Sequence, residues 1–217
     1  MAKNWLVIPQ EQRVDTLGDL NGETREVWIG LHGYGQLVEY FQRHFRELVT
    51  VERAFVFPQG THKFYLQGTK GRVGASWMTK DERVKDIDNQ RVFLKAVMQW
   101  VREQCPEARI HFVAFSQGVA TVMRFLGHEP SPVHSVLAWS GSWPPDLEDR
   151  NLATLRKVNF QGWFGSDDEY IGTEKQEEIL ARYREEYELE PEVGYYEGGH
   201  AFDREILTSE IERLERL

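Results

Sequence analysis

Cysteine is nearly absent from this sequence, which contains only Cys105 among its 217 residues. A single cysteine excludes an internal disulfide and suits a chain that folds in a reducing compartment. Long apolar runs are absent too, since none approaches the roughly 18 residues that a membrane-spanning helix needs. We therefore expect a cytoplasmic protein that is not stably inserted in a membrane.

Positive charge is the next shortage, with 26 Lys and Arg against 35 Asp and Glu and a formal net charge of −9. A negative field opposes binding to phosphate backbones and to anionic membrane surfaces. Paired metal-ligand spacing such as H-E-x-x-H is also missing among the histidines. The sequence thus predicts no nucleic-acid partner and no metal site.

Apolar runs that alternate with helical patterns are what the chain does contain. This alternation predicts a three-layer α/β/α sandwich with a mostly parallel sheet, and the length fits one domain over residues 1–217. We expect Trp5–Thr16 to add an antiparallel edge and Thr61–Met78 to be a loop, with no separate lid domain. The expected strands are Arg25–Leu31, Arg53–Pro58, Arg109–Phe115, Val133–Ser140, Lys157–Phe164 and Glu192–Tyr196. The expected helices are Leu37–Val49, Ile87–Cys105, Gln117–Leu126, Thr173–Glu186 and Phe202–Leu217.

Chemically useful residues follow four of these strands, and ligands of open α/β sheets bind outside the carboxyl ends of the strands. A serine needs a base to remove its proton, and a carboxylate can orient a histidine for that task. Backbone N–H groups must also face the developing oxyanion. The candidates, in chain order, are the turn His32–Gly35, Ser116, the pair Asp167 and Asp168, and His200.

Two of these residues have ordinary alternatives. Ser116 sits between a buried strand and a buried helix, with the small residues Ala114 and Gly118 two positions away on either side. That context is typical of a strand-to-helix nucleophile elbow, but a serine there can also cap the helix. His32, beside two glycines, is better explained as a residue that holds the turn by hydrogen bonds.

The motifs "LHGYGQ", "FPQG", "AFSQG", "GSDDEYI" and "GGHAF" together resemble the small serine α/β-hydrolases of the carboxylesterase/phospholipase and acyl-protein thioesterase group. The resemblance runs from about residue 27 to residue 202, with the motifs in the group's order. It implies an α/β-hydrolase fold, Ser116 as nucleophile, His200 as base and Asp168 as acid, without a metal or cofactor. The spacing Gly-x-x-Asp-x-x-aliphatic favours Asp168 over its neighbour Asp167.

The resemblance also implies an oxyanion hole and a substrate-binding loop. The hole would use the backbone N–H groups of Tyr34 and Gln117. In the group, a loop that often carries a tryptophan borders the cleft, so Trp77 is the candidate wall of the acyl pocket, with Phe64 and Tyr65 beside it. The alternative is that these aromatic residues only pack the loop onto the protein.

The expected function is hydrolysis of carboxylic esters or thioesters through an acyl-enzyme, with a small-molecule substrate. A peptidase, amidase or lyase that uses the same triad stays open, as does a non-catalytic hydrolase fold that binds a ligand. A homodimer also stays open, because no apolar stripe in the sequence settles the oligomeric state.

Overall fold

The computed structural model describes residues 3–129 and 132–217. Its centre is a seven-stranded sheet in the order β1-β3-β2-β6-β7-β8-β9. All neighbouring strands in this sheet are parallel except β1, which runs antiparallel to β3. The strands are β1 Val14–Leu17, β2 Glu26–Leu31, β3 Arg53–Pro58, β6 Arg109–Phe115, β7 Ser135–Trp139, β8 Asn159–Gly165 and β9 Glu192–Tyr196.

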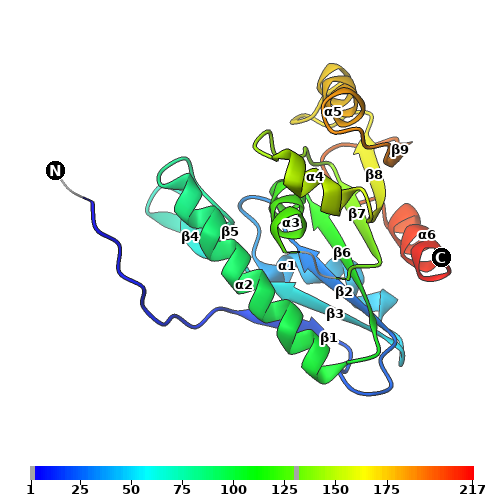
Figure 1. Cartoon of the computed structure of the whole chain (residues 1–217), viewed down its shortest axis with the longest axis horizontal. Coiled ribbons are helices and arrows are strands. Elements are labelled where there is room, and N and C mark those ends of the chain that lie inside the picture. Colours follow the sequence, from blue (N-terminus) through cyan, green and yellow to red (C-terminus); the bar gives the residue numbers. More distant parts are fainter. Residues whose placement is uncertain (1–2, 130–131) are drawn as a thin grey trace.

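Helices cover both faces of the sheet (Figure 1). One buried cluster packs α2 (Arg83–Gln104), α3 (Gln117–His128), α4 (Asp149–Leu155) and α5 (Thr173–Glu185) against one face. A second cluster packs α1 (Val38–Phe41), the 3₁₀ helix η1 (Gln42–Leu48) and α6 (Arg204–Glu215) against the other. Central strands such as β6 and β7 are buried on both sides, which explains their continuous apolar sequences. The predicted three-layer α/β sandwich is confirmed.

Some local predictions were wrong. The expected loop Thr61–Met78 holds a hairpin of β4 (His62–Gln67) and β5 (Lys70–Ser76). Glycines at 68, 71 and 74, which are typical of loops, led to the wrong prediction. The expected helix Leu37–Val49 is a short α-helix followed by 3₁₀ turns. Only the last residues of the expected edge Trp5–Thr16 join the sheet, as part of β1. The helix α4 was not predicted.

Candidate active site

Ser116 lies on a sharp turn between β6 and α3, at the carboxyl edge of the sheet. Its backbone angles are φ +53° and ψ −116°, and its side chain makes no capping hydrogen bond to the helix. Non-glycine residues keep such a strained conformation only where the surroundings enforce it, most often at functional sites. Ser116 therefore does not cap the helix, and its backbone has the form of a sharp strand-to-helix elbow.

Glycines let the backbone segments around Ser116 approach one another. A Cβ at Gly118 would lie 2.4 Å from the carbonyl oxygen of Leu31, at the end of the neighbouring strand β2. A Cβ at Gly141 would lie 2.6 Å from the carbonyl oxygen of Ser116 itself. The Ser116 N–H donates to the Trp139 carbonyl oxygen at 2.9 Å, which ties the elbow to β7.

Asp168 and His200 meet at the same edge, from the loops after β8 and β9. His200 Nδ1 donates to Asp168 Oδ2 at 2.7 Å, and the Asp168 side chain is fully buried. Asp168 Oδ1 accepts the backbone N–H groups of Tyr170 and Ile171, each at 2.9 Å. Burial would raise the pKa of Asp168, but these hydrogen bonds, led by that from His200, outweigh it and hold the pKa below its usual value. The carboxylate therefore stays ionised and leaves His200 Nε2 free to accept a proton.

Asp167 takes no part in this pair. Its side chain is exposed, its Oδ2 accepts the Ser166 hydroxyl at 3.1 Å, and its N–H donates to the Gly198 carbonyl oxygen at 2.9 Å. The structure thus places Asp168, and not Asp167, next to the imidazole of His200.

The imidazole of His200 is held by residues that the sequence did not point to. The ring of Phe115, which precedes Ser116, lies 4.8 Å from the His200 ring, so the elbow and the histidine are neighbours. Tyr170 meets the same ring at 4.8 Å, edge to face. Glu169 Oε2 accepts the His200 backbone N–H at 3.2 Å, and Trp139 Nε1 donates to the carbonyl oxygen of Ala201 at 2.9 Å. These contacts join residues far apart in sequence, so no local pattern indicates them.

Two backbone N–H groups next to Ser116 have no hydrogen-bond acceptor within residues 3–129 and 132–217, those of Tyr34 and Gln117. Gln117 is the first residue of α3, and the first N–H groups of a helix have no hydrogen-bond partner within that helix. The Tyr34 turn is fixed on both sides, because Gly33 N–H donates to Gln36 Oε1 and Gly35 N–H to the Ala75 carbonyl oxygen, each at 2.8 Å. Both groups are suited to an oxyanion.

Replacing Gly74 with alanine should lower kcat by about tenfold to a hundredfold, a part of what the loss of one oxyanion donor costs. A Cβ at Gly74 would lie 2.6 Å from the carbonyl oxygen of Gly35, so the Tyr34 turn must shift. The matched control is Gly22→Ala, whose Cβ meets nothing within 4 Å. Steady-state kinetics on folded variants measures the effect, and an unchanged kcat in Gly74→Ala would contradict this account of the turn.

His32 is buried behind the Tyr34 turn and holds it by hydrogen bonds. Its Nδ1 donates to the Gly33 carbonyl oxygen at 2.7 Å, and its Nε2 accepts the Gly60 N–H at 2.9 Å. Burial lowers the pKa of His32 to about 4, although the bond to Gly33 opposes the shift. A neutral, fully bonded imidazole has no free nitrogen for catalysis.

We expect the ring nitrogens of His32 to titrate near pH 4 in the folded protein, as measured by ¹⁵N NMR. Because the unfolded chain binds this proton near pH 6.5, the free energy of unfolding should fall as the pH drops from about 6.5 to about 4. The loss from this group is on the order of 3 kcal/mol. A midpoint near 6.5 in the folded protein would show that the imidazole is accessible to protons.

Trp77 is fully buried and does not border an open cleft. Its Nε1 donates to the His32 carbonyl oxygen at 2.8 Å, and its ring stacks on His32 with 5.1 Å between centroids. Its backbone N–H donates to Gln117 Oε1 at 3.0 Å. The sequence left two interpretations of Trp77: a wall of the acyl pocket, or a residue that packs its loop onto the protein. The buried position corresponds to the second, which corrects the assignment as a pocket wall. The sequence could not show this, because the group that accepts the indole N–H belongs to His32, 45 residues earlier in the chain.

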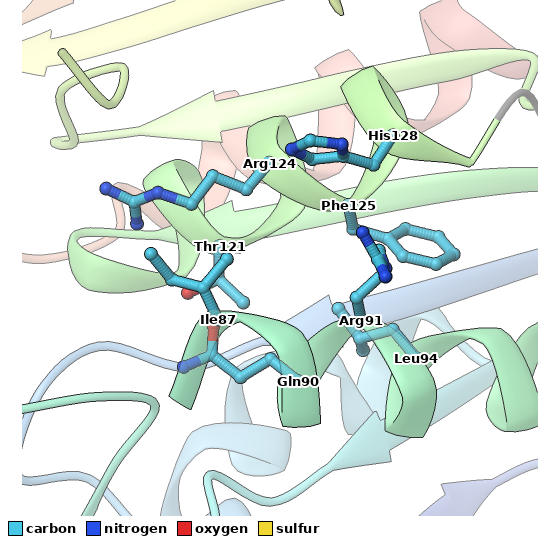
Figure 2. A pocket seen from close by; sticks show the side chains of 8 residues that line it. All are labelled: Ile87, Gln90, Arg91, Leu94, Thr121, Arg124, Phe125 and His128. Carbon is cyan, nitrogen blue, oxygen red and sulfur yellow. The ribbon is translucent and has the colours of Figure 1, made fainter. Parts of the chain in front are cut away.

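The cavities in the described part of the chain include the following three. The first, between α2 and α3, has room for about one water molecule, and side chains of both helices line it, among them Gln90 on α2 and Thr121 on α3 (Figure 2). The second lies against Trp143 and is equally narrow. The third, of about 470 Å³, is at the amino ends of β8 and β9. None of these three is lined by Ser116, Asp168 or His200.

Residues 3–129 and 132–217 contain neither a candidate metal-binding cluster nor a candidate membrane-spanning helix. No group of three or more His, Cys, Asp or Glu side chains there could hold a metal ion. No helix in the same residues is long and apolar enough to cross a membrane.

Comparison with known proteins decides the family. Residues 20–216 match the phospholipase/carboxylesterase family, which is most of the chain. The chain belongs to that family. The resemblance of its motifs is thereby confirmed, and the chain is a carboxylic ester hydrolase by family membership. No curated protein sequence matches it.

Solved structures show the same fold at low sequence identity. Esterase PE8 has a TM-score of 0.73 and 17% identity over 94% of this chain and 100% of its own. Acyl-protein thioesterase 2 of Zea mays has a TM-score of 0.72 and 12% identity, covering 95% of this chain and 99% of its own. The Bacillus cereus carboxylesterase has a TM-score of 0.63 and 13% identity, covering 94% of both chains. Identities this low establish the fold of the family member and leave its substrate to its own residues.

Proposed function

We propose that this family member is a serine hydrolase that cleaves carboxylic esters or thioesters through an acyl-enzyme on Ser116. The observation that carries the proposal is the 2.7 Å hydrogen bond between His200 Nδ1 and the buried Asp168 carboxylate. The His200 ring lies 4.8 Å from the ring of Phe115, the residue before a serine held at φ +53° at the end of β6. In this proposal the nucleophile, the base and the orienting acid come from three loops at one edge of the sheet, after β6, β9 and β8.

The proposed acylation step follows from these positions. Ser116 Oγ attacks the acyl carbon while His200 Nε2 takes its proton, and Asp168 stabilises the imidazolium that forms. The acyl oxygen becomes an oxyanion that accepts the N–H groups of Tyr34 and Gln117. When the intermediate collapses, the bond to the leaving group breaks and the proton on Nε2 passes to the alcohol or thiol. Water then attacks the acyl carbon while His200 Nε2 takes its proton, the bond to Ser116 Oγ breaks, and the proton passes to Oγ as the carboxylic acid leaves.

Exposed aromatic residues around the serine support an apolar substrate. Tyr34 is 62% exposed and its ring lies 5.0 Å from that of Phe64 on β4. On the histidine side, Tyr170 is 74% exposed. An extended acyl group could lie against these rings without entering a deep pocket. This edge therefore supports small or extended acyl groups rather than a large enclosed ligand.

A panel of p-nitrophenyl esters, thioesters and anilides with matched acyl groups of graded length tests the reaction class. We expect ester and thioester hydrolysis and a much slower reaction with the anilide. Dominant anilide cleavage would instead support the amidase or peptidase alternative. No turnover of any substrate, together with ligand binding, would support a non-catalytic hydrolase fold.

The remaining expectations about the protein's setting are proposals as well. The net charge of −9 supports a protein without nucleic-acid partners, and the single buried cysteine supports a cytoplasmic location. One sheet shared by both buried clusters supports a single domain over residues 1–217. We propose a homodimer as the oligomeric state.

A further inference from the structure

The segment before β1 exposes four consecutive large apolar side chains. Trp5, Leu6, Val7 and Ile8 are 54%, 88%, 102% and 72% exposed, and residues 3–13 form no helix or strand. In Figure 1 this dark-blue segment leads away from the body of the protein. An ion pair between Lys3 and Glu82 at the start of α2 accompanies this extended path. Single exposed apolar residues are ordinary, but a continuous run of this kind marks an interaction surface.

The neighbouring strand β1 offers an unpaired edge. It is the terminal strand of the sheet and pairs only with β3. Gln59 N–H donates to the Arg13 carbonyl oxygen at 3.0 Å, so the alternation of an antiparallel ladder turns the backbone groups of Val14 and Thr16 away from β3. An edge with free N–H and C=O groups is a template for another extended segment.

We propose that residues 5–8 of one chain pair antiparallel with β1 of a second copy, and that the two copies exchange these segments reciprocally. A twofold axis at Glu11 places Ile8 opposite Val14 and Leu6 opposite Thr16, which are the β1 residues with free backbone groups. Reciprocal pairing of one patch with itself is the ordinary form of a twofold dimer.

The sequence of the segment fits this register. Pro9 falls opposite Arg13, whose backbone groups already point to β3, so the missing N–H of proline costs no hydrogen bond. Ile8 comes to lie beside Val14, which packs on the α2–α5 cluster, and Trp5 beside Leu17, which packs on the α6 cluster. The four exposed side chains would thus extend both buried clusters of the partner copy.

The mass of the full-length chain in solution tests the dimer first. By light scattering, we expect a mass about twice 25.4 kDa at micromolar concentration. The double variant Leu6→Asp/Ile8→Asp should have the mass of one chain at the same concentration and the same kcat as the parent, which shows that it is folded. A monomeric parent, or a variant that remains dimeric, would overturn the proposal.

Engineered cysteines test the register. Val7→Cys with Asp15→Cys occupies a pair without mutual backbone hydrogen bonds, where the Cα atoms are close enough for a disulfide. On a non-reducing gel we expect a covalent dimer, joined between positions 7 and 15 of different chains. The matched control, Leu6→Cys with Asp15→Cys, faces opposite sides of the ribbon and should stay unlinked. A bridge that forms within one chain would mean that the segment folds back on its own β1, and it would also overturn the exchange.

Discussion

Replacing Ser116 with alanine should lower kcat for a short p-nitrophenyl ester by at least about a thousandfold. The variant keeps the Tyr34 turn and the pair of Asp168 and His200, but it has no side-chain oxygen at position 116 that could form an acyl-enzyme. His200→Ala should cause a loss of similar size, and the double variant should lose little more, because the two residues act in one step.

The control for this experiment is Ser142→Ala, which removes an exposed hydroxyl in the loop after β7. It should leave kcat unchanged. Equal unfolding midpoints of the parent and the Ser116 variant would show that the fold persists. Near-normal turnover by folded Ser116→Ala would mean that another group is the nucleophile.

Replacing Asp168 with asparagine should reduce kcat by up to about 10⁴-fold. The carboxylate accepts the Nδ1 proton of His200, whereas an amide can donate to Nδ1 and favour the tautomer with its proton on Nε2. A protonated Nε2 cannot take the proton of Ser116. The pKa of Asp168 is held below its usual value, so the parent enzyme keeps this carboxylate ionised at neutral pH.

The neighbouring residue gives the matched control. Asp167→Asn makes the same chemical change one position earlier, on an exposed side chain that bonds to Ser166. We expect its kcat to stay within about threefold of the parent value, since removal of a surface carboxylate has a small effect. A larger loss in Asp167→Asn than in Asp168→Asn would reverse the assignment of the acid.

The sequence predicted the sheet well because its central strands have an unambiguous pattern. β6 and β7 are buried on both faces and read as unbroken apolar runs, and helical periodicity follows β6. The carboxyl edge collects Ser116, Asp168 and His200 as a consequence of parallel topology alone. The order of the strands along the chain therefore located the candidate site.

The features that the sequence missed depend on tertiary contacts. The glycine at position 74 suggested a loop, but Gly74 lies in the strand β5. A glycine is needed there because a Cβ would lie 2.6 Å from the carbonyl oxygen of Gly35. Trp77 was expected at the wall of the cleft, but it is buried and donates its indole N–H to the His32 carbonyl oxygen. Tyr170 packs on an imidazole 30 residues away. Local patterns encode propensity and periodicity, but they do not encode which surfaces meet.

Labelling with a fluorophosphonate probe tests the central claim most directly, because the probe reacts with a serine whose hydroxyl is activated by a base. We expect one label per chain, found by mass spectrometry on the peptide that contains Ser116. The label should be absent in Ser116→Ala and strongly slowed in Asp168→Asn, but unaffected in Asp167→Asn. An unlabelled parent protein, or a label on a different serine, would contradict the assignment of Ser116 as the nucleophile.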